Sequence, residues 1–313
     1  MKIMRTLWQS DAKLTAVGIL MTALLGATGI ALLVDPRQIL GAPAWMKPAK
    51  FAASIAIYTF TLAWVFTYLR EWPRTRRIAS WVTTVTLLLE IVIIDTQVWR
   101  GTTSHFNVGT VLDGVLFTIM GLAIVIQTLV ATAVAVALWR QRFSDRAMGW
   151  ALRLGMTVTI IGAMTGGLMT QPTRAQLDNA RAGNPMTIAG AHTVGAPDGG
   201  PGLTGTGWSR EHGDLRVAHF LGLHSLQVLA LAALFFTRKG WQEKRRVRMV
   251  WAISASYVSL FALLLWQALR GQSVVALDAA TMAALGLWAV LTASAIWLAS
   301  SRAASARVHA VVY

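Results

Sequence analysis

Long apolar stretches separated by short polar connections dominate the hydropathy pattern of this chain. A helix needs about 20 apolar residues to cross the hydrocarbon core of a bilayer. Eight windows meet this length, at residues 14–34, 51–69, 78–99, 109–139, 148–170, 217–237, 249–269 and 277–299. The pattern predicts an all-α polytopic membrane helix bundle with eight transmembrane helices, in which residues 1–313 form a single integral membrane domain.

Basic residues gather in alternate connections, and this distribution predicts the orientation of the helices. Short cytoplasmic loops carry an excess of Lys and Arg. When the N-terminus is placed in the cytoplasm, most of the 28 basic residues fall on that side. They are Lys2, Arg5, Lys13, Arg70, Arg74, Arg76, Arg77, Arg140, Arg142, Arg146, Arg153, Arg238, Lys239, Lys244, Arg245, Arg246, Arg248, Arg302 and Arg307. Both termini are therefore predicted to be cytoplasmic.

The composition is that of a membrane protein, and it limits the kinds of partner that are expected. Apolar residues make up 55% of the chain and charged residues 13%, whereas soluble domains are about 25% charged. The net charge of +15 is explained by inner loops that determine topology and contact anionic lipids at the cytoplasmic face. No nucleic acid is expected, because no soluble domain remains to bind it. The absence of cysteine excludes disulfides, iron–sulfur clusters and thiol catalysis.

One connection, residues 171–216, is much longer than the others. Its Gly and Pro residues, densest at 197–202 and 205–208, predict tight turns and irregular backbone. The topology places this loop outside the cytoplasm. Long loops without secondary structure are usually lids or disordered, and His192, Trp208 and His212 favour an ordered cap over the bundle. In the fifth window, Gly162 and Gly166 form a small-xxx-small pattern that predicts close helix packing.

The most unusual polar residues enter the sixth apolar window. Arg216, His219, His224 and Gln227 share one face of a continuous helix at 100° per residue. Ionisable groups at membrane depth mark functional sites by default. The two histidines are five residues apart, unlike the i, i+4 pair of helical zinc motifs. They are therefore expected to meet groups from other helices.

Such groups occur at matching depth, given a rise of 1.5 Å per residue. They predict one outward-opening cavity between the third, fourth and sixth helices. Its catalytic candidates are Glu90, Asp113 and His224; its cofactor-binding candidates are Arg100, His105, Asn107, Asp214 and Arg216; its metal-ligating candidates are His105, His219, His224 and Glu90. Lys47 and Lys50 stand on the outer side, against the charge bias, either as interfacial anchors or to attract an anion. The alternative is that pairs such as Glu90 with His224, or Asp113 with His219, only fix helix packing.

Four segments carry a resemblance to a known family: residues 47–51, 100–107, 192–200 and 213–227. They resemble a family of uncharacterised bacterial multi-pass inner-membrane proteins, over about the second to sixth helices. The resemblance implies a location in the bacterial inner (plasma) membrane and brings no activity with it.

Several functions remain open at this point. Imidazole and carboxylate groups suit first-row metals, and one haem b held by histidine, with arginines for its propionates, is also compatible. A metal or haem site predicts an oxidoreductase-like or metal-handling protein. The same groups would serve as relays in a proton-coupled transporter of a small anionic solute. The third alternative is a structural subunit of a membrane complex. Besides the lipid bilayer, a homo-oligomer or a membrane-complex partner therefore remains open as a partner.

Overall fold

The computed structural model describes residues 2–301 and divides the chain into two compact units. Unit 1 comprises Met1–Ala137, Gly167–His192 and Ala196–Gly207, and unit 2 comprises Leu138–Gly166, Thr193–Gly195 and Trp208–Tyr313. Arg302 and Arg307, which the charge pattern assigns to the cytoplasm, lie outside the described residues. Each unit is helical, with only short two-residue strands among the described residues.

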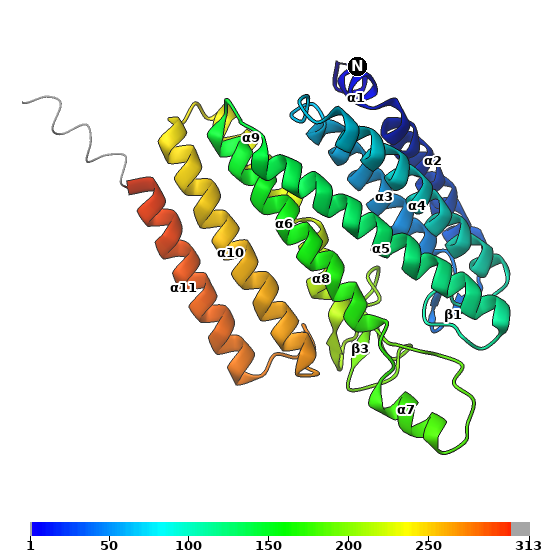
Figure 1. Cartoon of the computed structure of the whole chain (residues 1–313). Helices are drawn as coiled ribbons and strands as arrows, with labels where there is room; N and C mark the ends of the chain where they lie inside the picture. Colours follow the sequence, from blue (N-terminus) through cyan, green and yellow to red (C-terminus); the bar gives the residue numbers. More distant parts are fainter. Residues whose placement is uncertain (1, 302–313) are drawn as a thin grey trace, which may run out of the picture. The chain divides into compact units, whose positions relative to one another are not determined.

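Unit 1 combines long helices that lie side by side with short helices (Figure 1). They are α1 (Lys2–Ser10), α2 (Ala12–Val34), α3 (Met46–Val65), α4 (Pro73–Trp99), most of α5 (Val111–Arg140), and α7 (Arg174–Arg181). The helix α2 packs along α3, and α4 contacts both. Buried Val17, Met21, Ile55 and Ile91 form a core between these three helices. This core holds α3 and α4 in place, and these two helices carry the candidate site.

Local sequence explains where the helices of unit 1 begin. The side chain of Asp11 accepts a hydrogen bond from the Leu14 amide and caps α2. Pro73 lies in the first turn of α4, where a missing N–H costs nothing. Between α2 and α3, β1 (Gln38–Ile39) and β2 (Ala42–Pro43) form an antiparallel hairpin. Both residues of its turn, Leu40 and Gly41, have positive φ angles, as a type I′ turn requires.

The part of the long loop that belongs to unit 1 is ordered by hydrogen bonds. Thr173 and Gln176 form a capping box at the start of α7. The Gln176 amide also bonds both backbone groups of Gly190. Farther along, the Thr206 carbonyl accepts from Lys50 Nζ on α3 at 2.9 Å. The loop therefore lies against the N-terminal end of α3.

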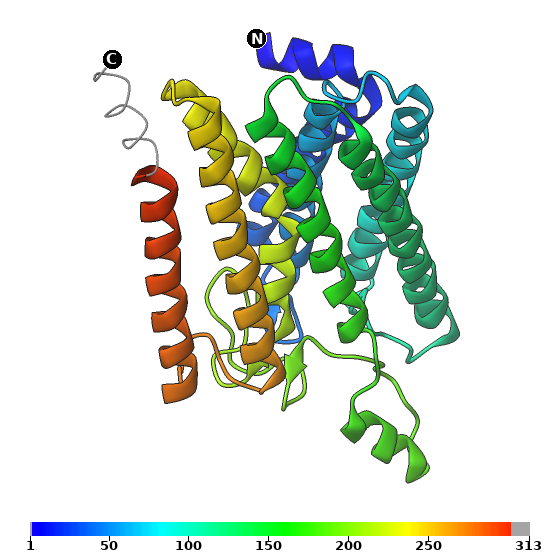
Figure 2. The same cartoon turned by 60° about the vertical axis from the view of Figure 1, so that its left-hand side comes forward.

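Unit 2 contains the remaining helices. They are α6 (Arg146–Met169, up to Gly166), α8 (Leu215–Leu223), α9 (Ser225–Arg238), α10 (Glu243–Leu269) and α11 (Ala279–Ser301). The helix α10 contacts α8, α9 and α11, and Figures 1 and 2 both show α11 running beside α10. A short antiparallel pair joins β3 (Thr193–Val194) to β4 (Gly213–Asp214) just before α8.

The helices have the length and composition of membrane spans. Among residues 2–301, seven helices are long and apolar enough to cross a bilayer, and α8 with α9 pass the same test as a pair bent by 44°. Counting that pair as one span gives eight, each overlapping one predicted window. The protein is thus an all-α bundle of membrane-spanning character. The sequence did not predict the separate helix α1, and α3 begins five residues before its predicted window.

The bend between α8 and α9 corrects the expectation of one continuous sixth helix. The break falls at His224, whose φ and ψ of −91° and 3° end α8 and precede α9. Groups on α6 satisfy the interrupted backbone: the Thr159 hydroxyl donates to the Leu223 carbonyl and accepts from the Leu226 amide. A shared helical face for residues 216–227 is therefore wrong beyond residue 223.

The glycines of α6 have the packing role that the small-xxx-small pattern predicts. A Cβ on Gly162 would come within 2.5 Å of the Gly222 backbone, so the two helices touch there through backbone atoms. A Cβ on Gly166 would lie 3.3 Å from the ring of His219. Both contacts belong to unit 2, and they bring α8 close enough for the hydrogen bonds at the break.

Candidate functional site

The most unusual side chain in unit 1 is the carboxylate of Glu90 on α4. Glu90 is 2% exposed. Its Oε1 lies 3.4 Å from His105 Nε2, and its Oε2 is buried without a hydrogen-bond partner among the described residues. Buried polar atoms are almost always satisfied, so an unsatisfied carboxylate oxygen marks a place where a proton, water or ligand is expected.

His105 connects this carboxylate to a lysine. Its Nδ1 lies 2.9 Å from Lys47 Nζ and 3.1 Å from Ser104 Oγ. An ammonium can only donate, so Lys47 is charged toward an accepting Nδ1, and the imidazole proton then sits on Nε2, toward Glu90. The three residues, called here the Lys47–His105–Glu90 cluster, form a directed chain of titratable groups from the first turn of α3 to the middle of α4.

Aromatic rings enclose the imidazole of this cluster. The ring centroids of Phe51, Phe106 and Phe117 lie 5.6, 6.2 and 6.4 Å from that of His105. Lys47 Nζ also stands 6.0 Å from the Phe51 ring. Apolar walls reduce the local dielectric and strengthen the interactions among the three groups of the cluster.

The segment that carries His105 is held in a strained conformation. Phe106 has a φ of +64°, in the left-handed region that residues other than glycine rarely adopt. Its carbonyl accepts from the Ala189 amide at 2.8 Å, and its ring lies against the ring of His192 with centroids 4.8 Å apart. His192 is in turn bonded to Asp198 through Nδ1 at 2.7 Å. The long loop thus fixes the position of His105, and such strain is often found at functional sites.

Asp113 and Arg100, both candidates from the sequence, bind each other. Arg100 Nη1 donates to Asp113 Oδ1 at 2.5 Å, and Gln97 Nε2 donates to the same oxygen at 2.8 Å. The Thr110 hydroxyl donates to Asp113 Oδ2 at 2.6 Å. Every acceptor oxygen of this carboxylate is satisfied. The arrangement ties the end of α4 to the start of α5 and leaves Asp113 little capacity for chemistry.

Asn107 has a local structural role. Its Nδ2 donates to the Thr102 hydroxyl and the Thr103 carbonyl, and its Oδ1 accepts from the Gly109 amide. These bonds close the turn between α4 and α5. The residue therefore shapes the loop around His105, and its side chain is engaged within that loop.

In unit 2, Asp214 and Arg216 also form a closed pair. Asp214 is 1% exposed and caps α8. Its oxygens accept from Nε and Nη2 of Arg216 at 2.9 and 2.6 Å, and from the amides of Arg216 and Ser209. Both arginines expected to receive a propionate or another anion, Arg100 and Arg216, thus hold a carboxylate of their own unit.

The two histidines of the sixth window differ in their surroundings. His219 Nδ1 lies 2.7 Å from the Gly162 carbonyl and 3.2 Å from Thr165 Oγ1. Because a carbonyl only accepts, Nδ1 carries a proton, and Nε2 is the nitrogen that would ligate a metal. His224 lies at the helix break, and its imidazole has no hydrogen bond to the described residues.

Some predicted neighbours are found together, and a residue outside the predicted set joins them. Glu90 and His105 lie side by side in unit 1, while Asp214 and Arg216 pair in unit 2; the meeting of Glu90 or His105 with His219 and His224 stays a prediction. Among residues 2–301, no group of three or more His, Asp or Glu side chains is arranged to hold a metal ion. Lys47, which the sequence did not place in the site, contacts His105, and its position against the charge bias was the signal.

Comparisons of this chain with protein-family models, with curated proteins and with solved structures find no match.

Proposed function

We propose that the chain is a proton-coupled membrane transporter of a small anion, and that the Lys47–His105–Glu90 cluster carries its proton transfer. The observation that supports this proposal is the position of His105, with one ring nitrogen on an ammonium and the other facing a buried carboxylate. Ionisable groups in such chains within membrane helices are typical of proton relays.

The cluster can move a proton without leaving an unbalanced charge. Lys47 passes a proton to His105 Nδ1 while His105 Nε2 passes its own to Glu90, so an ammonium and a carboxylate become an amine and a carboxylic acid. Proton transfer needs about 2.6–3.2 Å between heavy atoms, so the 3.4 Å contact between His105 and Glu90 shortens during the step. Oε2 of Glu90, which has no partner among the described residues, is the atom from which the proton continues.

Uptake of a proton from outside changes the net charge of the cluster. Once the amine of Lys47 takes up that proton, an ammonium stands beside a neutral Glu90 and the cluster favours an anion; with Glu90 ionised, the two charges compensate each other. The affinity for an anion therefore follows the protonation state of Glu90, and this dependence is the coupling that such a transporter requires. Arg100 and Arg216 are already paired with carboxylates and do not argue for an anion site. That the transported solute is an anion is therefore part of the proposal.

Reconstitution into proteoliposomes tests the proposal. Vesicles containing a pH-sensitive dye receive an outward pH gradient, and acetate, sulfate or inorganic phosphate is added outside. We expect proton movement that depends on one of these anions, reduced about 100-fold in Glu90→Gln. The matched control is Asp95→Asn, which removes another carboxylate of α4 outside the cluster and should retain flux within about twofold of wild type.

Infrared difference spectra between acid and alkaline pH provide a second readout that needs no substrate. The carbonyl-stretch band of protonated carboxylic acids should lose one component in Glu90→Gln, and this component should remain in Asp95→Asn. His105→Gln should shift the pH midpoint of this band. Full flux in Glu90→Gln, or equal losses in both carboxylate variants, would contradict the proposal.

A metal ion or a single haem b remains a second candidate, favoured by the hydrogen bond between His219 Nδ1 and the Gly162 carbonyl. Ligating histidines usually donate their other N–H to a carbonyl or carboxylate in this way. The rest of the expected donor set fits less well, because Arg100 and Arg216 bind carboxylates. Absorbance near the Soret region and metal analysis of the purified protein test this candidate: a signal lost in His219→Ala supports it, and a colourless, metal-free preparation rejects it.

A further inference from the structure

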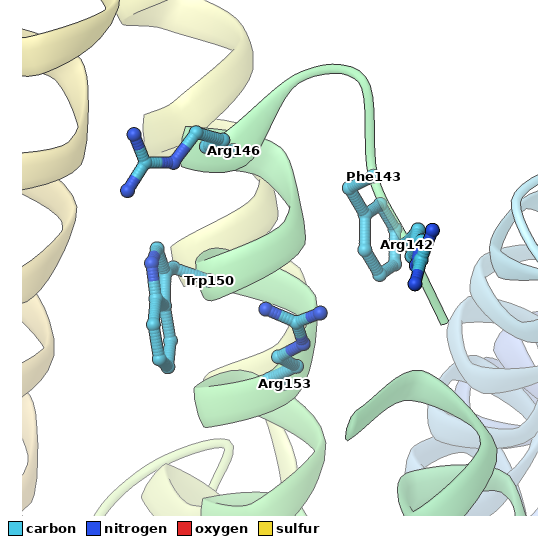
Figure 3. A pocket seen from close by; sticks show the side chains of 5 residues that line it. All are labelled: Arg142, Phe143, Arg146, Trp150 and Arg153. Atoms are coloured by element: carbon cyan, nitrogen blue, oxygen red, sulfur yellow. The ribbon is translucent and has the colours of Figure 1, made fainter. Parts of the chain in front are cut away.

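A pocket lined by arginines lies in unit 2 at the start of α6, and none of its lining residues belongs to the proposed relay. Its volume is 420 Å³, and its lining consists of Arg142, Phe143, Arg146, Trp150 and Arg153. Figure 3 shows Arg146 and Trp150 on one side, Phe143 and Arg142 on the other, and Arg153 between them. Three of the five lining side chains are cationic and none is acidic.

The protein holds one of these arginines in place without neutralising it. Arg153 donates from Nε to the Leu138 carbonyl at 3.0 Å and from Nη2 to the Gln141 carbonyl at 2.7 Å. Its guanidinium also lies over the rings of Phe143 and Trp150, at 5.2 and 5.3 Å from their centroids. Carbonyl oxygens and aromatic faces orient a guanidinium but leave its full charge in the pocket.

The turn before α6 brings the other two arginines to the same place. Gly149 permits this turn, because a Cβ there would lie 2.8 Å from the Phe143 ring. The guanidinium groups of Arg142 and Arg146 form no ion pair with the described residues, and both residues are exposed. The exposed guanidinium groups of Arg142 and Arg146, which have no ion pair among the described residues, therefore lie on either side of the fixed guanidinium of Arg153.

The acidic residues near the pocket are already occupied. Asp145 caps α6 by accepting from the amides of Ala147 and Met148, and its other oxygen accepts from Arg246 Nη1 at 2.6 Å. Glu243 accepts from the backbone amide of Arg146 at 3.0 Å. Neither carboxylate lines the pocket, so the charge of its arginines is available to an external anion.

We propose that this pocket binds a phosphate group, presented by the headgroup of an anionic phospholipid. Guanidinium groups match phosphate oxygens in geometry and charge. Two features favour a lipid as the source. Trp150 packs against Trp139 and Trp251, with centroids 5.8 and 4.8 Å apart, and such aromatic clusters are typical of the membrane interface. The pocket also lies at the helix end that the charge pattern assigns to the cytoplasm, where anionic lipids bind basic segments.

Native mass spectrometry of the full chain in detergent tests the proposal with defined probes. Phosphatidylglycerol and phosphatidylcholine are added separately, and soluble glycerol phosphate is added as a competitor. We expect phosphatidylglycerol to bind about tenfold more tightly than phosphatidylcholine. The double variant Arg142→Gln/Arg146→Gln should lose about 30-fold in affinity for phosphatidylglycerol, given roughly 1 kcal/mol for each of the two basic residues near an anionic surface.

The matched control is Arg74→Gln/Arg77→Gln, which removes the same charge from exposed residues of α4 outside the pocket. It should change affinity by less than about twofold, and equal melting temperatures of the two double variants show that both remain folded. Pocket-dependent binding of glycerol phosphate without lipid binding would support phosphate recognition and assign it to a soluble ligand. Equal losses in both variants, or no binding of either probe, would overturn the proposal.

Discussion

Glu90 in unit 1 and Asp214 in unit 2 are equally buried, at 2% and 1% exposure, yet their surroundings differ. Asp214 accepts four hydrogen bonds, two of them from the guanidinium of Arg216. Glu90 faces one imidazole and keeps an oxygen without a partner among the described residues. Burial alone therefore does not identify a reactive carboxylate. Incomplete satisfaction beside a titratable neighbour does, because a fully bonded carboxylate is held in one charge state and one position.

The largest expected effect is on the free energy of unfolding, which should respond differently to the replacement of these two carboxylates. Asp214→Asn leaves the half-buried Arg216 without its counter-charge and should reduce the free energy of unfolding by about 3 kcal/mol. Glu90→Gln removes a poorly satisfied buried charge and should change it by less than about 1 kcal/mol. Denaturant-induced unfolding in mixed micelles measures both. A loss in Glu90→Gln as large as that in Asp214→Asn would show that Glu90 is also a structural residue.

A smaller effect is expected at the break between α8 and α9. There, as around Asp214, polar groups of unit 2 have hydrogen-bond partners within the unit. Thr159→Val keeps the side-chain shape but removes the hydroxyl that bonds the Leu223 carbonyl and the Leu226 amide. The free energy of unfolding should fall by about 1–3 kcal/mol, and the Leu226 amide should exchange faster with solvent deuterium.

The control for this variant is Thr128→Val on α5. That exposed hydroxyl bonds only the Ile124 carbonyl of its own helix, so its loss should leave stability within about 0.5 kcal/mol of wild type. If both threonine variants behave alike, the hydroxyl of Thr159 does not support the break.

The smallest effect concerns an exposed pair in unit 1, Asp35 with Arg37. Hydrogen bonds from the side chain and backbone of Arg37, and from Trp45 Nε1, hold the pKa of Asp35 well below its ordinary value of 3.8. A carboxylate with a lowered pKa stabilises the folded state above that ordinary value, and the contribution disappears as the pH falls below it. Asp35→Asn lacks this contribution at every pH, so it should melt slightly below the wild type at neutral pH, and the two melting temperatures should converge as the pH falls below about 4.

Melting temperatures followed over an acid titration check this expectation. Asp178, whose ion pair with Arg181 is far more exposed, supplies the comparison: Asp178→Asn should retain the acid dependence of the wild type. An unchanged acid profile in Asp35→Asn would mean that the pair with Arg37 forms equally in the unfolded chain.

Part of the candidate site follows from the sequence by depth and spacing. The sequence predicted Glu90 inside one cavity and His105 at its rim, on connected segments, and the structure brings Oε1 of Glu90 to 3.4 Å from Nε2 of His105. Their link to Lys47 was missed because a lysine near a helix start usually extends toward the membrane surface. The roles of Asp113 and Arg100 were also missed, since spacing shows that two charges are near each other but not that they neutralise each other.

The sequence by itself determined the membrane class, the positions of the apolar helices, and the glycine contact on α6, because each depends on local composition and period. Only the tertiary structure decided which buried charges are satisfied and where the sixth apolar segment breaks. The break at His224 cannot be found from its own apolar residues, since the groups that stabilise it belong to α6. Whether a buried polar group has a hydrogen-bond partner depends on contacts between helices, so it cannot be derived from the hydropathy of a single helix.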